Sequence, residues 1–253
     1  QGSVHLKLLQ AGFLLFILAF LLAPLSALIG HDAFWRDVAL STQDWSSIAT
    51  SLLGGAMALC IIVLTGTPLA FYLARAHGRL ALLAEAAVLM PMLMPTLALG
   101  ILLAVTFGPA APLGRAFAAI GITLTNSPAA FLLATIYAAL PTYVIAARGA
   151  IAQVPDEYEG LARTLGDGLW TARLRVTLPM ARKGLAAALS LAWVRALGEF
   201  GIILIVAYYP AGMPVQLWTD VQDLGLQAVF PLVAMFLLAT LPVPLWLSLR
   251  ARA

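Results

Sequence analysis

Long apolar runs separated by short polar segments dominate this chain. Six runs are long enough to cross a bilayer, since a helix rises about 1.5 Å per residue through a hydrocarbon core about 30 Å thick. They cover approximately residues 8–29, 48–74, 82–106, 128–148, 185–207 and 227–249. The runs are too long, and alternate too little between polar and apolar positions, for barrel strands. The pattern predicts an all-α, polytopic membrane protein with six transmembrane helices, the first of them uncleaved.

Composition supports this interpretation. Of the 253 residues, 62% are hydrophobic and 10% are charged, with a mean hydropathy of +0.99. A soluble domain could not cover its surface with so few charges. We therefore treat residues 1–253 as one transmembrane domain in a lipid bilayer, and we expect no nucleic-acid partner.

The positive charges are distributed unequally between the two sides. With six spans, eleven of the 14 lysines and arginines fall on the side of both termini, only Arg36 and Arg115 fall on the other, and Arg195 lies inside a span. Cytoplasmic loops of membrane proteins carry this excess of positive charge. Both termini and the loop 149–183 are therefore predicted to be cytoplasmic. The outer segment 107–127 carries turn residues around a short apolar stretch, which suggests a re-entrant or interfacial helix.

Nothing in the chain resembles a catalytic centre. There is no Gly-x-x-x-x-Gly-Lys-Ser/Thr phosphate-binding loop, the three histidines and one cysteine are scattered, and no Ser/His/Asp arrangement can be argued. We expect no catalytic residue, cofactor or metal in this chain. Energy for any transport must then come from elsewhere.

The loop 149–183 is predicted to contain two short helices. Pro155 suits a first helical position, and the acidic residues 156–157 follow where the helix dipole favours anions. Gly166 suits the left-handed residue after a helix end. Asp167 can then cap a second helix, which Pro179 is expected to close. The loop is either a solvated connector or a surface that a soluble partner grips.

Two further features lie within the predicted spans. Pro91 and Pro95 stand one turn apart and are expected to kink the third span, for packing or to line a path. Arg195 and Glu199 lie near the bilayer midplane at a spacing that lets them pair on one helix face. This pair is either a packing element or, through Arg195, a source of positive potential for an anion.

The loop resembles the EAA loop of ABC importer permeases. In that family the sequence Glu-Ala-Ala is followed at fixed spacing by Gly and then by an aliphatic residue, any residue, and Leu-Pro. Here Ala162, Gly166, Val176, Leu178 and Pro179 fall at the matching positions. The chain departs from the pattern with Gly160 in place of Glu and Leu161 in place of Ala, and it carries Glu159 one position earlier. The resemblance covers residues 46–249. It implies that the loop, with Arg163 near the end of its first helix, is a coupling helix that docks on a cytoplasmic ATPase.

Other segments resemble the molybdate, tungstate and sulfate branch of this family. The stretch Gly198-Glu199-Phe200-Gly201 and the stretch from Pro91 to Pro95-Thr96 carry the likeness. Segments 207–210 and 225–231 favour the molybdate/tungstate members. The resemblance implies import of a tetrahedral oxyanion through the inner membrane, with Pro95, Thr96, Arg195 and Glu199 as candidate residues of the path. It implies two permease copies, two cytoplasmic ABC ATPase subunits that use ATP and Mg, and an extracytoplasmic substrate-binding protein.

Three alternatives remain at this point. The same mechanism could carry sulfate or thiosulfate. A proton-coupled secondary transporter could use Glu199 as its proton site and would need no ATPase. An intramembrane enzyme is disfavoured, because no pair of candidate catalytic groups converges in the spans.

Overall fold

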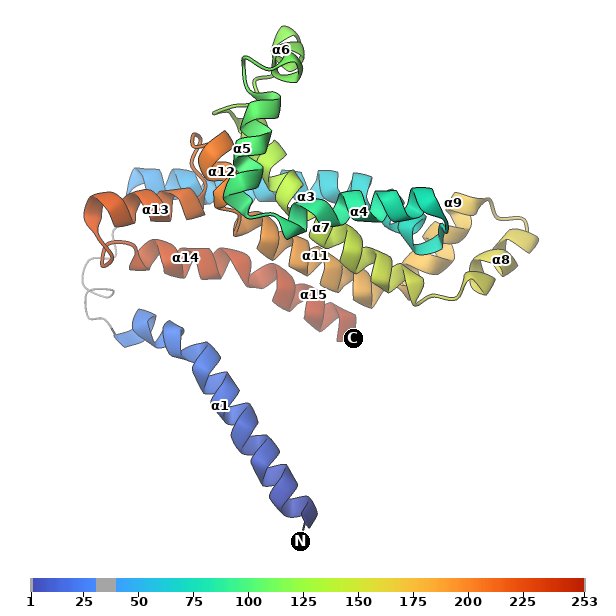
Figure 1. Cartoon of the computed structure of the whole chain (residues 1–253). Coiled ribbons are helices and arrows are strands. Elements are labelled where there is room, and N and C mark those ends of the chain that lie inside the picture. Colours follow the sequence, from blue (N-terminus) through green and yellow to red (C-terminus); the bar gives the residue numbers. More distant parts are fainter. Residues whose placement is uncertain (1, 31–39, 253) are drawn as a thin grey trace.

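The computed structural model describes residues 2–30 and 40–252, which are mostly α-helical, with no strand among them. Figure 1 shows a long bundle from which α1 extends away. Arg36, which the charge count places on the outer face, lies outside the described residues. The helices are α1 (Gly2–Gly30), α3 (Thr42–Arg75), α4 (Arg79–Leu93), α5 (Thr96–Phe107), α6 (Pro112–Ala119), α7 (Pro128–Ala152), α8 (Asp156–Thr164), α9 (Leu169–Ala172), the π-helical turn η1 (Arg173–Thr177), α10 (Leu178–Met180), α11 (Arg182–Leu197), α12 (Gly201–Val206), α13 (Met213–Leu224), α14 (Phe230–Thr240) and α15 (Pro242–Arg252).

The membrane-protein prediction is confirmed, but the count of six continuous spans is not. Among the described residues, four helical segments are long and apolar enough to cross a membrane: α1 through Leu9–Ser26, α3, α7, and α14 with α15 through Phe230–Arg250. The pair α4 and α5 would make a fifth, although the two helices meet at an angle of 113°.

The expected spans 82–106 and 185–207 are each broken. The first breaks at Met94, which is extended because the ring of Pro95 disfavours helical backbone in the residue before it. The second breaks between α11 and α12, where Glu199 bonds the backbone at the start of α12 instead of continuing the helix. The predicted kink at Pro95 is thus a complete break in the helix.

The helix ends follow local sequence signals. Ser41 and Asp44 form a capping box at the start of α3: the Asp44 N–H donates to Ser41 Oγ at 3.1 Å, and the Ser41 N–H donates to Asp44 Oδ2 at 2.7 Å. Ser127 caps α7, and Pro128 occupies its first turn. A short helix, α6, lies within 107–127 as expected, and its position relative to a membrane stays a prediction.

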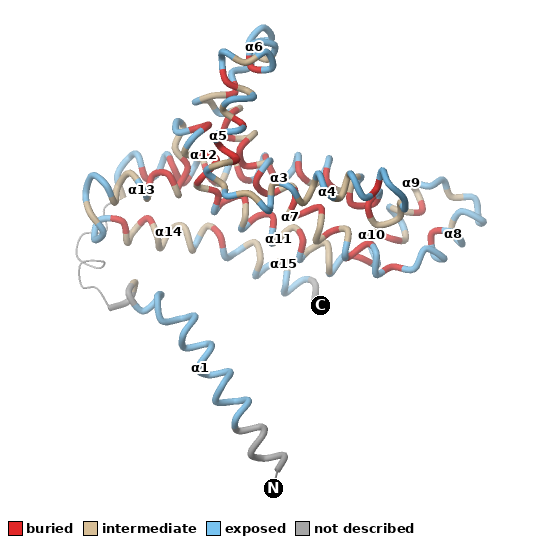
Figure 2. The backbone as a smooth tube through the Cα atoms, viewed as in Figure 1, coloured by how far each residue is buried: buried red, intermediate tan, exposed pale blue. Residues whose placement is uncertain are grey.

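The core of the bundle is built around α7, which packs against α3, α4, α11 and α12. Small side chains on α7 are buried and let the neighbouring helices approach closely, as in other membrane bundles. These are Ala134, Ala138, Ala139, Ala147 and Ala150. Figure 2 shows the buried positions concentrated along this bundle, whereas the residues described in α1 are mostly exposed. The loop formed by α8, α9 and η1 lies at one end of the bundle, and α13 lies at the other (Figure 1).

Candidate functional site

The loop 149–183 folds as two helical pieces joined at a glycine, as predicted. After α8, the Gly166 N–H donates to Arg163 O and the Asp167 N–H donates to Ala162 O, both at 3.1 Å. Gly166 has a φ of +104°, so the helix ends in the two-bond arrangement that favours glycine. The predicted left-handed residue is therefore confirmed.

The second half of the loop differs from the prediction. Gly168, not Asp167, stands at the start of α9 and makes no side-chain cap, while Asp167 Oδ1 lies 3.4 Å from Arg175 Nη1. Pro179 does not close the helix but lies within α10. Proline lacks an N–H and crowds the preceding turn, and the wider π-helical turn η1 before it accommodates that defect.

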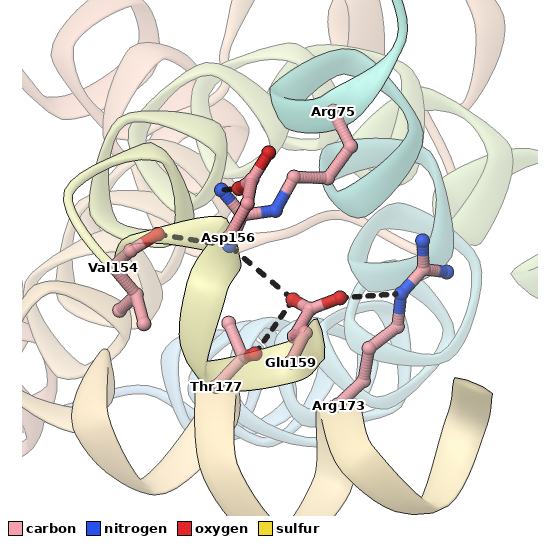
Figure 3. Close-up of polar contacts among 6 residues, drawn as sticks. All are labelled: Arg75, Val154, Asp156, Glu159, Arg173 and Thr177. Carbon is pink, nitrogen blue, oxygen red and sulfur yellow. Dashed lines mark hydrogen bonds and ion pairs between the residues drawn. The ribbon is translucent and has the colours of Figure 1, made fainter. Parts of the chain in front are cut away.

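Glu159 is the centre of a buried polar network (Figure 3). Its Oε1 accepts from Thr177 Oγ1 at 2.6 Å and from Arg75 Nη2 at 3.2 Å. Its Oε2 lies 3.7 Å from Arg173 Nε. Arg75 also pairs with Asp156 and donates from Nη2 to the carbonyl of Val154 at 2.9 Å. One carboxylate thus joins the end of α3, the helix α8 and the turn η1.

Arg173 is held by aromatic rings as well as by Glu159. Its guanidinium carbon lies 5.0 Å from the ring centre of Phe71 and 5.1 Å from that of Trp170. These two rings meet edge to face at 6.5 Å. A guanidinium over aromatic faces is attracted by their negative potential. The loop is therefore attached to α3 through Phe71 as well as through Arg75.

The sequence-predicted loop residues differ in exposure: one is buried, three (Ala162, Val176 and Leu178) are partly buried, and the rest, Gly166 and Pro179 among them, are exposed. Glu159 is buried and contacts this chain's own residues, so it does not contribute to the exposed surface. Gly160, Leu161 and Arg163 are exposed on α8. Further apolar side chains of the loop are exposed beside them, a pattern that marks interaction sites on protein surfaces: Leu165, Leu169, Trp170 and Leu174. We call these residues and the exposed part of α8 the loop surface.

Sequence reasoning missed the partners of Glu159. Arg75 ends an apolar run 84 residues before Glu159, and no local pattern links the two. The one available signal is that Arg75 ends a predicted span on the same side of the membrane as the loop.

The candidate path residues lie where two helix breaks meet. Gly201, the first residue of α12, is packed so closely on α5 that a Cβ there would clash with Thr96 Oγ1 and lie 2.9 Å from Leu97 N. Pro95 stands immediately before Thr96, in the break between α4 and α5. The structure thus places Pro95 and Thr96 beside the start of α12.

Arg195 and Glu199 form the predicted ion pair, with Nη1 and Oε2 2.5 Å apart. They do not share one continuous helix face, because α11 ends at Leu197. Glu199 is completely buried, and its Oε1 accepts from the N–H of Ile202 at 2.8 Å. The carboxylate therefore neutralises Arg195 and also satisfies a backbone donor at the start of α12. No group of three or more potential metal-ligating side chains occurs in the described part of the chain.

A family model described as "Binding-protein-dependent transport system inner membrane component" matches residues 66–251. A probable molybdenum ABC transporter permease protein of Haloferax volcanii is 35% identical over 89% of this chain and 82% of its own length. The molybdenum transport system permease protein ModB of Mycobacterium tuberculosis is 34% identical over 75% and 73%. The molybdate/tungstate transport system permease protein WtpB of Thermococcus kodakarensis is 30% identical over 90% and 89%.

Two solved structures have a similar fold at low sequence identity. A bacterial ABC transporter that imports alginate superposes with a TM-score of 0.74, over 97% of this chain and 95% of that one, at 16% identity. The methionine ABC transporter MetNI superposes with a TM-score of 0.64, over 81% and 93%, also at 16% identity.

Proposed function

This chain belongs to the binding-protein-dependent transport system inner membrane component family, and from that premise we propose that it imports molybdate or tungstate as the permease subunit of an ABC transporter. The assignment of the transported anion rests on the similarity, over most of the chain, to permeases named for molybdenum, molybdate or tungstate. Sulfate or thiosulfate import is the nearest competing function.

The loop surface is the proposed docking site for a cytoplasmic ATPase. It combines exposed apolar side chains with the exposed Arg163, at one end of the bundle. Two such ATPase subunits would supply the ATP and Mg chemistry that this chain lacks. The excess of lysine and arginine on this side supports a cytoplasmic loop and cytoplasmic termini.

A pair of permeases and an external binding protein complete the proposed transporter. A single bundle whose core is filled by buried alanines encloses no wide path, which supports a homodimer with the path between two copies. The breaks at Pro95–Thr96 and Gly198–Phe200 would line that path. Short helices separated by irregular backbone are tolerated at membrane depth where they face protein or a water-filled cavity.

Uptake into proteoliposomes tests this function. The chain would be reconstituted with its partner ATPase and binding protein, and radiolabelled molybdate uptake would be measured with and without ATP on the ATPase side. We expect ATP-dependent uptake that unlabelled tungstate suppresses and an equal excess of sulfate does not. Suppression by sulfate alone would instead indicate that the transporter imports sulfate. Uptake driven by a proton gradient without ATP would instead support a secondary transporter that uses Glu199.

A further inference from the structure

We propose that Arg75 is a positioning residue that ties the loop helix α8 to α3, and that α3 carries movement of the loop to α13 at the far end of the bundle. This inference rests on the proposed ATPase docking at the loop surface. It adds the route by which that docking reaches the opposite side of the membrane.

The attachment of α8 to the membrane helices depends on few side chains. Arg75 contacts three acceptors that belong to α8 or to the chain leading into it: the carboxylates of Asp156 and Glu159 and the carbonyl of Val154. A guanidinium presents its donors in a rigid planar fork, so several acceptors bound together fix its orientation. The side chains of Arg75 and Glu159 are only 14% and 10% exposed, which shields their contact from water, whereas the Asp156 side chain is 69% exposed. A displacement of α8 must therefore move the end of α3 or break a set of charge-assisted bonds.

The helix α3 is suited to pass this movement on. It remains one α-helix for 34 residues, with Pro68 inside it, which corresponds to about 51 Å at 1.5 Å per residue. In contrast, α4 and α5 are separated at Pro95, and α11 and α12 are separated at Glu199. The helix α7 is also continuous and enters the loop directly, but α3 is the helix that pairs with α8 through Arg75 and hydrogen-bonds to α13 through Ser51.

The far part of α3 is bonded to α13. Ser51 Oγ accepts from the backbone N–H of Met213, the first residue of α13, at 2.8 Å, and both residues are buried. Gly212 approaches so closely that a Cβ there would lie 3.0 Å from Ser51 Oγ and 2.9 Å from Phe131 Cε2. Figure 1 shows α13 and the loop at opposite ends of the bundle. The helix α3 thus contacts the loop through Arg75 and contacts α13 through Ser51.

This arrangement predicts that the loop end and the α13 end of the bundle influence each other equally. If ATPase closure displaces α13 through α3, a binding protein that displaces α13 must influence the ATPase by the same free energy. Arg75 is therefore expected to affect the coupling between the two ends rather than either binding event alone.

The test compares Arg75→Gln and Arg75→Lys with the control Arg79→Gln, in the full transporter. Arg79 lies four residues away, is exposed, and has no ion pair among the described residues. We would measure capture of the ATPase, basal ATP hydrolysis, its stimulation by the binding protein, and molybdate carried per ATP. Arg75→Gln should retain capture and basal hydrolysis and lose about tenfold in stimulation and in molybdate per ATP, within the usual range of coupling energies. Arg75→Lys should recover part of the loss, and the control should behave as wild type.

Three outcomes would overturn the proposal. Loss of ATPase capture in Arg75→Gln would mean that Arg75 only shapes the loop surface. An unchanged amount of molybdate transported per ATP would mean that α3 does not transmit movement of the loop. Ser51→Ala provides a second variant should Arg75→Gln fail to fold, since it cuts the connection at α13 without touching the loop. It should also uncouple stimulation from hydrolysis, and normal coupling in it would reject the route. Absence of ATP-dependent uptake in the wild-type transporter would instead reject the proposed function.

Discussion

Two buried glutamates, Glu159 in the loop and Glu199 between α11 and α12, hold arginines in contrasting ways. Glu159, on α8, makes polar contacts with residues of α3 and η1, up to 84 positions away in sequence. Among the described residues, the polar partners of Glu199 are Arg195 and the backbone of Ile202, both within four positions. The first carboxylate therefore fixes separate elements relative to one another, and the second stabilises one local break in a helix.

The surroundings of the two carboxylates differ as well. Glu159 lies near the water-exposed loop surface, and its arginines keep other partners: Asp156 and Val154 for Arg75, and two aromatic rings for Arg173. Glu199 is fully buried within an apolar bundle, and Arg195 has no second acidic partner among the described residues. A charge left unpaired costs more where water cannot reach it.

The largest effect is therefore expected from Arg195→Leu. It leaves the carboxylate of Glu199 fully buried without its counter-ion, whereas the Arg195 side chain is 34% exposed, so the loss should lower the free energy of unfolding by about 3–5 kcal/mol. The matched variant Arg75→Leu should cost only about 1–3 kcal/mol, since Glu159 retains Thr177 and Arg173 as partners. Unfolding of the purified protein in detergent measures both. Equal losses would show that the two sites do not differ in the way their contacts suggest.

The two regions also use glycine differently. Gly166 has open space around it but a φ of +104°, whereas Gly201 is in close contact with Thr96. Gly166→Ala should therefore strain the backbone by about 1–3 kcal/mol and reduce ATPase capture without weakening the membrane core. Gly201→Ala should force α12 away from α5 at a cost of about 1–3 kcal/mol, and lower the unfolding midpoint of the core.

Each glycine has a control. Gly160→Ala adds a Cβ in open space on α8 and should leave capture and stability unchanged. Thr96→Ala combined with Gly201→Ala removes the clashing hydroxyl and should restore part of the lost stability. Loss of capture in Gly160→Ala, or no recovery in the double variant, would contradict the distinction between backbone strain and close packing.

Sequence reasoning located both regions but only part of their structure. The glycine turn at 166 and the pairing of Arg195 with Glu199 follow from local spacing, and the structure contains both, whereas the predicted spans 82–106 and 185–207 are each broken into two helices. The break at Pro95 has a local cause that the sequence displays, yet its size of 113° depends on packing against α12. The contact between Arg75 and Glu159 joins distant parts of the chain. It is fixed by how α3 and α8 meet, which no local pattern encodes.

The smallest effect is expected when both members of the membrane pair are removed together. Arg195→Leu alone leaves Glu199 buried and unpaired, which is the source of its expected loss of about 3–5 kcal/mol. The double variant Arg195→Leu with Glu199→Leu contains no unpaired charge, and the remaining loss is the acceptor for Ile202, about 1 kcal/mol by analogy with helix caps. We expect the double variant to recover stability and molybdate transport together, because Glu199 is fully buried and contacts only its own segment. Unfolding in detergent and uptake in proteoliposomes measure the two quantities side by side. A stable double variant that binds the ATPase but carries no molybdate would show instead that Arg195 supplies positive potential to the anion along its path.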